Sequence, residues 1–435
     1  MKRLIMEGLI AWKDSRNRKP LIIRGARQVG KTWLMREFGK KEYERVAYVN
    51  LESSSAMKGV FQADFNTNRI IQAIQIETGV QIDPSNTLII LDEIQEAYRA
   101  ITSLKYFQEN APEYHIVCAG SLLGVALHSH TSFPVGKVDF IDLHPLNFIE
   151  FLLATGQQGL VDALLSRDWV LINSFSEQFV RHLKNYYFVG GMPEAVVQFT
   201  ELEDMGEVRK IQQQILSAYE LDFSKHAPSE IVPRIRMLWN SIPAQLAKEN
   251  KKFIYGMIKQ GARAKEYELA LTWLIDCGFI NKVSRISKPA IPLKAYSDDG
   301  AFKLFIVDTG LLAAMNNLDV KTILDGNKIF QQFKGALTEQ YVLQQLITIK
   351  NVDVHYWTSE GARAEVDFLL QNEGRVLPIE VKAEENLKAK SLRVYTDKFQ
   401  PEIAIRTSMS DYREEDWLVN LPLYAISQVV KVGKE

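Results

Sequence analysis

The sequence predicts an α/β protein built in three successive parts, the first of which contains a parallel sheet. Two continuous apolar runs, Leu21–Ile23 and Thr87–Leu91, have the composition of strands buried on both faces of such a sheet. Between Ile231 and Asp308, helical spacing is followed by two strand-like runs separated by Pro, Ser and Gly residues. A further pair of strands surrounds a tight turn within Ala364–Ala383. We therefore expect a sheet domain, then a helical module with a hairpin, then a small α/β domain.

The length and composition of the chain limit its class. Its 435 residues favour about three domains, and a formal net charge of -1 gives no overall attraction for polyanions. The cysteines, Cys118 and Cys277, lie in no metal-ligand spacing and suit a reducing compartment. No apolar run approaches the roughly eighteen residues of a membrane span, and charges follow Met1 too soon for a secretory signal. We expect a cytoplasmic protein that makes no membrane contact.

The segment Leu21–Trp33 carries the phosphate-loop pattern G-x-x-x-x-G-K-[ST] between an apolar run and a helix-forming stretch. Its two glycines let the backbone wrap closely around an anion, and N–H groups at the start of the helix point at that anion. Lys31 is expected to reach the β- and γ-phosphates of ATP, and Thr32 to hold Mg²⁺. The residues expected to bind the nucleotide are Gly25, Ala26, Arg27, Gln28, Val29, Gly30, Lys31, Thr32 and Trp33.

The apolar run Thr87–Leu91 ends in Asp92-Glu93, which is the Walker B pattern. In a parallel sheet, the carboxyl end of this strand lies at the same edge as the phosphate loop. Asp92 is expected to bind Mg²⁺ directly or through water, and Glu93 to orient and deprotonate the attacking water. Acidic strand ends are common, but the position after a phosphate loop makes this one specific.

Further strands are expected to complete the sheet and to supply another polar residue. Arg45–Leu51 and Tyr114–Ala119 have strand composition, and Val138–Leu143 is predicted as the fifth strand. Ser121 is a candidate sensor that contacts the γ-phosphate or the attacking water. A serine that caps a helix predicted at Leu122–Leu127 is the open alternative.

The order of the motifs G-A-R-Q-V-G-K-T, N-L-E, L-D-E-I-Q, A-G-S and H-P-L-N-F-I-E-F-L resembles the AAA+ ATPases. More narrowly, it resembles a prokaryotic AAA-type ATP-binding family whose members carry a second domain of unknown function, and this resemblance covers essentially the whole chain. It implies a homo-oligomeric ring, because a neighbouring subunit completes each site. Family members often have Pro in place of Ala26 and usually Arg in place of Lys137. Lys lacks the planar fork of an arginine finger, so no finger is assigned.

The sequence in the middle of the chain predicts helices, followed by a basic surface suited to DNA. Helical spacing covers Phe148–Lys225, and the turn at Gly190-Gly191 and Pro193 is assigned a structural role. The helices and hairpin between Ile231 and Asp308 have the outline of a winged helix. Basic residues there favour phosphate contacts with DNA, although Glu residues dilute them and a solvated face is an equal alternative. These residues are Lys248, Lys251, Lys252, Lys259, Arg263, Lys265, Lys282, Arg285 and Lys288.

The C-terminal hairpin brings acidic residues together across its two strands. The segment A-E-V-D-F-L-L-Q-N-E-G-R-V-L-P-I-E-V-K-A predicts two strands around a tight turn at residues 373–374. A turn at that position makes Asp367 face Glu380, and Glu365 face Lys382. Alternation along the second strand places Glu380 and Lys382 on one side of it. Two carboxylates and a lysine are therefore expected to converge.

Glu339, on the preceding predicted helix, is available to the same cluster. Glu339, Asp367 and Glu380 form a candidate site for a second divalent cation, with Lys382 beside an attacking water. The spacing D-x(12)-E-x-K after a helical Glu resembles the PD-(D/E)xK nuclease fold, with Val366 in place of the usual proline. The resemblance implies a metal-dependent phosphodiesterase centred on Asp367, Glu380 and Lys382. The alternative is an electrostatic cluster in a fold that has lost catalysis.

The complete architecture that we expect is a P-loop NTPase domain with a helical extension (residues 1–225), a winged-helix module (226–330) and a PD-(D/E)xK nuclease-like domain (331–435). The expected function is ATP hydrolysis with Mg²⁺ that drives or gates a half in contact with DNA. Two alternatives stay open. One is an ATP-switched regulator that binds DNA or protein through a catalytically inactive nuclease fold, and the other is a nuclease that ATP only regulates.

Overall fold

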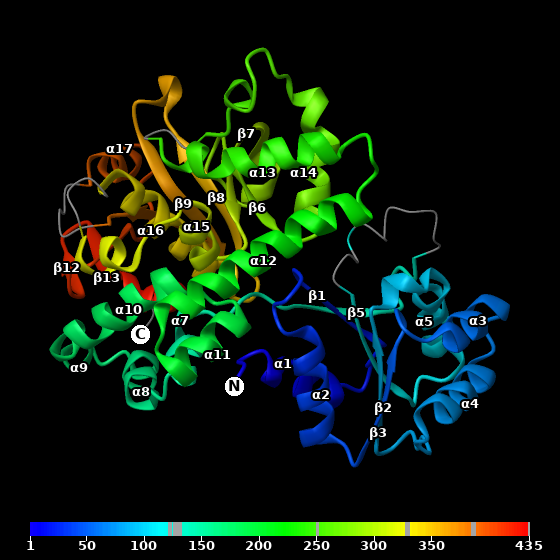
Figure 1. Ribbon diagram of the computed structural model, residues 1–435. Coiled ribbons are helices and arrows are strands. Elements are labelled where there is room, and N and C mark those ends of the chain that lie inside the picture. Colours follow the sequence, from blue (N-terminus) through cyan, green and yellow to red (C-terminus); the bar gives the residue numbers. More distant parts are fainter. Residues whose placement is uncertain (121–123, 125–132, 249–251, 327–330, 384–388, 434–435) are drawn as a thin grey trace. The chain divides into compact units, whose positions relative to one another are not determined.

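A computed structural model describes residues 1–120, 124, 133–248, 252–326, 331–383 and 389–433 (Figure 1). They divide into two compact units. The N-terminal unit contains residues 2–144 and 272–279, and the C-terminal unit contains residues 1, 145–271 and 280–435. Within the described part of the chain, no helix has both the length and the apolar character needed to cross a membrane.

The N-terminal unit is built on a parallel sheet whose five described strands follow the order β2-β3-β4-β1-β5. The strands are β1 (Leu21–Arg24), β2 (Arg45–Asn50), β3 (Thr87–Asp92), β4 (His115–Ala119) and β5 (Asp139–Asp142). Each strand that the sequence predicts for this sheet is confirmed. Strands β1, β3 and β4 are buried along most of their length, as apolar runs of this kind can be. The phosphate loop follows β1 and Asp92 ends β3, so both lie at the carboxyl edge of the sheet.

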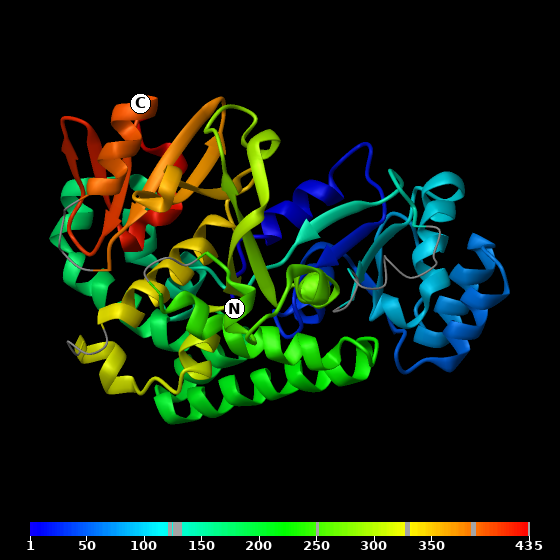
Figure 2. The ribbon, with the colours of Figure 1, turned by 90° about the horizontal axis from the view of Figure 1, so that it is seen from above.

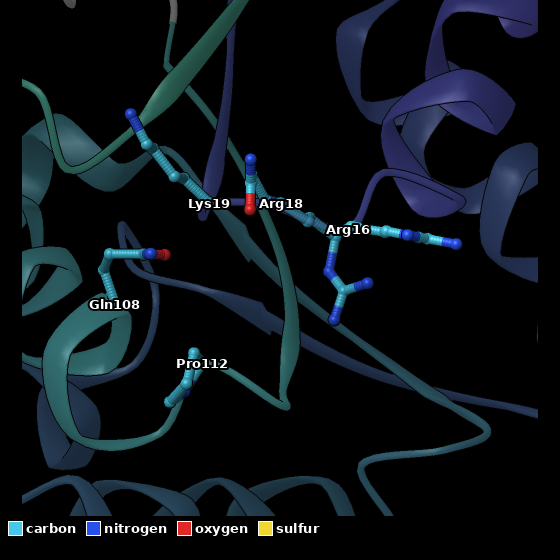
Figure 3. A pocket seen from close by; sticks show the side chains of 6 residues that line it. Arg16, Arg18, Lys19, Gln108 and Pro112 are labelled. Carbon is cyan, nitrogen blue, oxygen red and sulfur yellow. The ribbon is translucent and has the colours of Figure 1, made fainter.

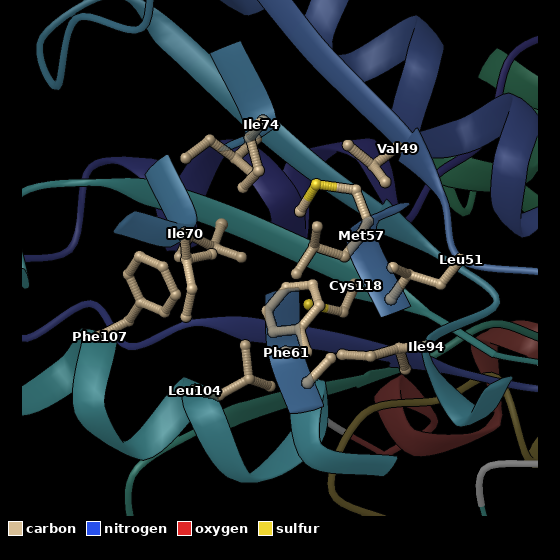
Figure 4. Close-up of a cluster of buried hydrophobic side chains, with 14 of the residues drawn as sticks. Val49, Leu51, Met57, Phe61, Ile70, Ile74, Ile94, Leu104, Phe107 and Cys118 are labelled. Carbon is tan, nitrogen blue, oxygen red and sulfur yellow. The ribbon is translucent and has the colours of Figure 1, made fainter. Parts of the chain in front are cut away.

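Helices cover both faces of this sheet. On one face, α3 (Ser55–Ala63), α4 (Thr67–Thr78) and α5 (Tyr98–Asn110) enclose the cluster of buried side chains in Figure 4, including Phe61, Ile70 and Leu104. On the other face lies α2 (Lys31–Glu42), whose Gly39 approaches the side chain of Leu88 on β3. The described residues of this unit also form α1 (Met6–Lys13), the short turn η1 (Ile94–Glu96) and the end of α14 (Ala264–Asp276). Helices thus cover the two faces of the sheet, and the phosphate loop lies at its carboxyl edge.

The C-terminal unit contains a mixed sheet whose eight described strands follow the order β12-β13-β11-β10-β9-β8-β6-β7. The strands are β6 (Ile280–Ile286), β7 (Ser297–Ile306), β8 (Asp353–Thr358), β9 (Glu365–Asn372), β10 (Arg375–Val381), β11 (Ile405–Ser408), β12 (Arg413–Glu415) and β13 (Leu418–Pro422). Figure 2 shows β6 and β7 side by side as an antiparallel hairpin. Because β6 also pairs with β8 in parallel, this hairpin belongs to the same sheet as the strands beyond residue 330.

The observed units differ from the three expected domains. The helices and the hairpin expected of a winged helix are present as α13 (Val232–Leu246), α14 (Ala264–Asp276), β6 and β7, but the hairpin is one end of the large sheet. The helices that we expected to extend the ATPase domain belong instead to the C-terminal unit. The physical reason is that these helices, among them α10 (Ser176–Val189) and α12 (Met205–His226), pack against α15 (Thr309–Met315) of that unit. The spacing of apolar residues predicts which face of a helix is buried, but it does not predict which other element covers that face.

The helices of the C-terminal unit surround this sheet (Figure 1). Besides α13 and the first part of α14, they are α7 (Phe148–Ala154), α8 (Gln158–Ser166), α9 (Trp169–Ser174), α10 (Ser176–Val189), α11 (Pro193–Leu202), α12 (Met205–His226), α15 (Thr309–Met315), α16 (Gln331–Leu346) and α17 (Lys390–Phe399). Shorter helical turns are η2 (Tyr255–Met257), η3 (Leu293–Tyr296), η4 (Thr322–Gly326), η6 (Glu360–Ala362) and η7 (Leu423–Lys431). Leu392 and Tyr395 of α17 pack in a cluster with Val366 and Leu369 of β9.

A buried hydrogen-bond network explains the Gly190-Gly191 turn. Asp308, which caps α15, accepts hydrogen bonds from the backbone N–H of Gly191 at 2.6 Å and from the side-chain amide of Gln344 at 2.9 Å. A Cβ atom at Gly191 would lie 2.0 Å from the carbonyl oxygen of Leu146. Only glycine allows this approach, so the structure supports the structural role expected of the pair.

Candidate functional site

The phosphate loop closes tightly between β1 and α2. Gly25 has a φ of +146°, and a Cβ atom added there would lie 2.2 Å from the carbonyl oxygen of Leu143. Gly30, the N-cap of α2, has a φ of +94° in the left-handed region. Close approach and backbone conformation thus require the two glycines of the pattern. The N-terminus of a twelve-residue helix follows directly, which is the arrangement that binds anions.

Lys31 is held inside this loop by the loop's own backbone. Its side chain is 8% exposed, and its Nζ donates hydrogen bonds to the carbonyl oxygens of Gly25 at 2.8 Å and Ala26 at 2.7 Å. Burial lowers the pKa of the ammonium to about 8, and the charges of Glu93 and Asp92 oppose this effect in part. The lysine therefore lies where phosphate oxygens would replace carbonyl oxygens as its acceptors.

The structure brings together the two residues expected to bind magnesium. Thr32 Oγ1 donates a hydrogen bond to Asp92 Oδ2 at 2.7 Å, although the residues come from α2 and β3. The other oxygen of Asp92 accepts from the backbone N–H of Glu93 at 3.1 Å. Asp92 is buried, with 3% of its surface exposed. Its carboxylate is consequently fixed in orientation by the groups around it.

Tyr48 is part of this site, and sequence analysis missed it. Its hydroxyl donates a hydrogen bond to Asp92 Oδ2 at 2.9 Å, and the guanidinium of Arg36 lies 3.9 Å from the centre of its ring. Burial and the charge of Asp92 raise the pKa of the Tyr48 hydroxyl. Tyr48 pairs with Ile90 across β2 and β3, and this strand adjacency could not be predicted from either strand alone.

Glu93 leaves β3 with a backbone conformation that is unusual for a residue with a side chain. Its φ is +50°, in the left-handed region, and such strain is concentrated at functional sites. Its Oε2 accepts a hydrogen bond from Gln95 Nε2 at 2.6 Å. The carboxylate expected to act on water thus has an amide donor two residues away.

The side chains at the loop fit a magnesium ion that also binds phosphates. Among the described residues, no group of three or more His, Cys, Asp or Glu side chains is arranged to hold a metal ion. Mg²⁺ in phosphate sites typically takes one or two protein oxygens and completes its shell with phosphates and water. The Thr32 hydroxyl and the Asp92 carboxylate offer such oxygens.

Two other predicted positions have different outcomes. Ser121 lies outside the described residues, so its sensing role stays a prediction. Lys137, which stands where the resembled family usually has Arg, pairs with Glu109 at 3.0 Å. That ion pair lies within the N-terminal unit and gives Lys137 a local role.

The C-terminal hairpin has the register that the sequence predicts. Strands β9 and β10 are antiparallel, with Ile379 opposite Phe368, and residues 373–374 both have positive φ values of 47° and 77°. Two successive positive φ values are typical of a type I′ turn, which fixes the register of the strands. One residue beyond that pair, Asp367 Oδ2 accepts a hydrogen bond from the backbone N–H of Val381 at 2.8 Å.

Glu380 and Lys382 form an ion pair on β10. The distance from Glu380 Oε1 to Lys382 Nζ is 2.6 Å, and Glu380 Oε2 accepts a hydrogen bond from the backbone N–H of Leu392 at 3.1 Å. Glu380 is buried and Lys382 is partly exposed. Both carboxylate oxygens of Glu380 therefore already have donors from the protein.

A residue that sequence analysis did not select completes this cluster. Lys303 of β7 is fully buried, and its Nζ lies 2.5 Å from Glu365, 3.6 Å from Glu339 and 3.9 Å from Asp367. A lysine inside the apolar strand A-F-K-L-F-I was the available signal, because an unpaired buried charge is costly. A second divalent cation at Glu339, Asp367 and Glu380 is not supported, since the described residues hold no such group.

Acidic neighbours neutralise part of the predicted basic surface. Lys282 lies 3.8 Å from Asp299, and Arg285 forms an ion pair with Asp298. Lys251 lies outside the described residues. DNA contact by this surface stays a prediction. Its exposed cations are Lys252, whose charge also acts on Asp298, Lys259, Arg263, Lys265 and Lys288.

A cationic cavity of about 470 Å³ lies elsewhere in the N-terminal unit (Figure 3). Its lining consists of Arg16, Asn17, Arg18, Lys19, Gln108 and Pro112. Residues 16–19 precede β1, whereas the phosphate loop follows it. The cavity therefore lies toward the opposite end of β1 and is not part of the nucleotide site.

The side chains at the carboxyl ends of β1 and β3 indicate which class of protein domain this unit resembles. In P-loop domains, a lysine within a glycine loop binds phosphates. The threonine after it is bonded to an acid at the end of another strand of the sheet, and the two residues bind magnesium. The comparison with protein families agrees, because residues 17–152 match the family described as "AAA domain". The N-terminal unit thus has a P-loop fold similar to that AAA domain, and this fold supports ATP binding.

Other comparisons add little about the rest of the chain. Residues 180–322 match "Domain of unknown function (DUF8612)" and residues 334–426 match "Domain of unknown function (DUF4143)". No curated protein matches the chain.

The structural similarity between this chain and solved structures is low. A Walker-type ATPase of Pyrococcus abyssi has a TM-score of 0.45 at 13% identity, over 72% of this chain and 94% of that one. The Aeropyrum pernix ORC1 protein in complex with DNA has 0.27 at 11%, over 72% and 90%. AMPPCP-bound DnaA from Aquifex aeolicus has 0.27 at 12%, over 62% and 85%. With such scores, the assignment depends on the family match and on the site.

Proposed function

We propose that the N-terminal unit binds ATP with Mg²⁺ and hydrolyses it. The observation that supports this most strongly is the hydrogen bond of 2.7 Å between Thr32 and Asp92, because it joins the side chains that hold magnesium in P-loop sites. Magnesium, when bound, neutralises charge that develops on the phosphates during transfer. The conclusion is an ATPase rather than a module that only binds anions.

The side chains of this site have different roles in ATP hydrolysis. Lys31 exchanges the carbonyl oxygens of its own loop for the β- and γ-phosphate oxygens, and binding is favoured because phosphate charge compensates its burial. Thr32 and Asp92 offer oxygens to the ion. Glu93 orients the attacking water and accepts its proton, and Gln95 limits where that carboxylate can lie.

The test measures phosphate release from ATP by the full chain with and without Mg²⁺. Lys31→Ala should abolish turnover, and Glu93→Gln should bind ATP with turnover lowered by about 10²-fold or more. Lys40→Ala is the matched control, because Lys40 is an exposed lysine on the same helix and should behave like wild type. Wild-type turnover at the level of Lys31→Ala would contradict the proposal.

A second candidate function is an ATP switch with negligible turnover. The hydrogen bond between Gln95 and Glu93 favours it, because an engaged carboxylate is less available to water. In that case wild type would bind ATP but hydrolyse it no faster than Glu93→Gln. Gln95→Ala separates the two functions further, since release of Glu93 should raise turnover only if this hydrogen bond restrains it.

We also propose that the C-terminal unit contacts DNA through exposed lysines on the segments before β6. Lys252 and Lys259 are both exposed. Each phosphate contact contributes about 0.9 to the slope of log affinity against log salt concentration. Neutralising Lys252 and Lys259 together should reduce that slope by up to about 2 in fluorescence-anisotropy titrations of a labelled duplex.

Lys210→Ala provides the control for the DNA experiment. Lys210 is also an exposed lysine of the C-terminal unit, but it is paired with Glu207 on α12. Its substitution should leave the salt slope unchanged. Equal slopes for wild type and the Lys252→Ala/Lys259→Ala variant would remove this surface from the proposal.

The same AAA-type assignment supports assembly into a homo-oligomer when ATP is bound. Glu93→Gln, which should retain ATP, is the suitable form for measuring molar mass by light scattering after gel filtration. We expect a mass above that of one chain with ATP and Mg²⁺, and a smaller species without them. A monomer under both conditions would contradict assembly.

A further inference from the structure

The C-terminal unit contains a lysine at the centre of its acidic cluster. Lys303 belongs to β7, whereas its nearest carboxylates belong to β9 and α16. Strands β6 and β8 lie between β7 and β9 in the order of the sheet. Lys303 nevertheless reaches Glu365 at 2.5 Å, with the ring of Tyr356 on β8 centred 4.9 Å from its Nζ.

The charge on Lys303 is stabilised by its surroundings. A fully buried ammonium would normally lose its proton, because burial favours the neutral form. Burial does act to lower the pKa of Lys303, but the carboxylates of Glu365, Glu339 and Asp367 outweigh it and raise the pKa above its usual value. The cluster thus contains an ammonium group that the chain itself supplies, within 3.9 Å of three carboxylates.

Asp367, which lies near this ammonium, and Glu380 on the neighbouring strand β10 have other protein donors as well. Asp367 Oδ2 accepts from the backbone N–H of Val381. Glu380 is bonded to Lys382 and to the backbone N–H of Leu392. A divalent cation would have to displace these donors, and the ammonium would repel it.

We propose that the ammonium of Lys303 occupies the cation position of this acidic cluster, so that the C-terminal unit is independent of metal and does not cleave phosphodiesters. The fold keeps its carboxylates because they neutralise Lys303 in the interior. The Lys303 ammonium replaces the divalent ion that an arrangement of this kind otherwise binds. This inference concerns the C-terminal unit alone and does not depend on ATP hydrolysis.

The first test measures Mn²⁺ binding to the nucleotide-free full chain by electron paramagnetic resonance, which detects the free ion. Asp367→Asn separates this cluster from any ion bound at the phosphate loop. Wild type and Asp367→Asn should bind the same amount of Mn²⁺. Wild-type binding that is lost in Asp367→Asn would overturn the proposal.

The second test creates the site by removing the internal cation. Lys303→Met keeps the length of the side chain without its charge and leaves three carboxylates facing one another. This variant should bind about one additional Mn²⁺ per chain, and Lys303→Met/Asp367→Asn should lose it again. A folded Lys303→Met protein that gains no Mn²⁺ would show that Lys303 does not hold a cation position.

A third measurement keeps the inference testable if Lys303→Met does not fold. Supercoiled plasmid is incubated with wild type and with Asp367→Asn in Mn²⁺, and nicking is scored on a gel. The proposal requires equal nicking by the two proteins. Nicking that depends on Asp367 would establish a metal-dependent nuclease and overturn the proposal.

Discussion

Raising the pH from 7 to 9 should weaken ATP binding because of the unusual position of Lys31. The pKa of its ammonium is lowered to about 8 by burial, so most of the charge is lost by pH 9 in the nucleotide-free protein. Phosphate groups next to the ammonium favour its charged form. The complex therefore keeps a proton that the free protein has released, and binding above pH 8 must include proton uptake.

The size of the effect follows from these two states. With a pKa near 8, about nine-tenths of Lys31 is charged at pH 7 and about one-tenth at pH 9. If the bound form stays charged throughout, the dissociation constant should rise about tenfold between these values, or about 1.4 kcal/mol. Lys31→Arg is the control, because guanidinium stays protonated across this range. Its affinity should vary much less with pH, whatever its absolute value.

The assay is calorimetric titration of wild type with a non-hydrolysable ATP analogue and Mg²⁺ at pH 7, 8 and 9. Wild type is used because the charge of Glu93 raises the pKa of Lys31, so Glu93→Gln would itself shift the titration. Buffers of different ionisation enthalpy report the number of protons taken up, which should approach one per ATP at pH 9 and be near zero at pH 7. A constant affinity, or an equal decline in the Lys31→Arg variant, would refute the role given to Lys31.

Two stability predictions complete the set. Gly191→Ala should lower the free energy of unfolding by about 3 kcal/mol or more, because its Cβ would lie 2.0 Å from the Leu146 carbonyl oxygen. Gly159→Ala, with no atom within 4 Å of the added Cβ, should be neutral or stabilising by up to about 1 kcal/mol; equal urea midpoints for the two variants would contradict this account. His115, bonded to Tyr43 at 2.6 Å, has a pKa lowered to about 4, chiefly by burial. The unfolded chain then takes up the proton first, so stability should fall as pH drops from 6.5 toward 4, by about 1 kcal/mol after solvent screening of this part-exposed ring; His115→Gln should remove that share of the pH dependence, and an unchanged profile in thermal unfolding would count against it.

The sequence was sufficient to predict the strands and the loop of the N-terminal unit because local chemistry determines them. A strand that is buried on both faces must be apolar along its length, and Thr87–Leu91 is. Gly25 and Gly30 are required by backbone geometry that other residues disfavour. The register of β9 and β10 was equally predictable, since a two-residue turn fixes the positions that follow it.

Features that depend on the order of strands could not be predicted in this way. Tyr48 contacts Asp92 only because β2 lies next to β3 in the sheet. The spacing of apolar residues along the sequence does not determine which strands are neighbours. For the same reason the hairpin of β6 and β7 was expected to be a separate module. Its pairing with β8 joins it to the large sheet. Helix α12 has an apolar face in either arrangement, so its burial in the C-terminal unit also required the structure.

The acidic hairpin shows how one distant residue can determine the chemistry of a motif. The spacing of Asp367, Glu380 and Lys382 brings carboxylates together whatever lies opposite them. The strand order then places Lys303 beside Asp367, Glu365 and Glu339, and a charge of that sign is needed because carboxylates removed from water without a cation are costly. A chain with the same spacing and an apolar residue at position 303 would satisfy its carboxylates only by binding a metal ion or by protonating them. The nature of the residue on β7, which lies outside the motif, therefore decides between an internal ion pair and a metal centre.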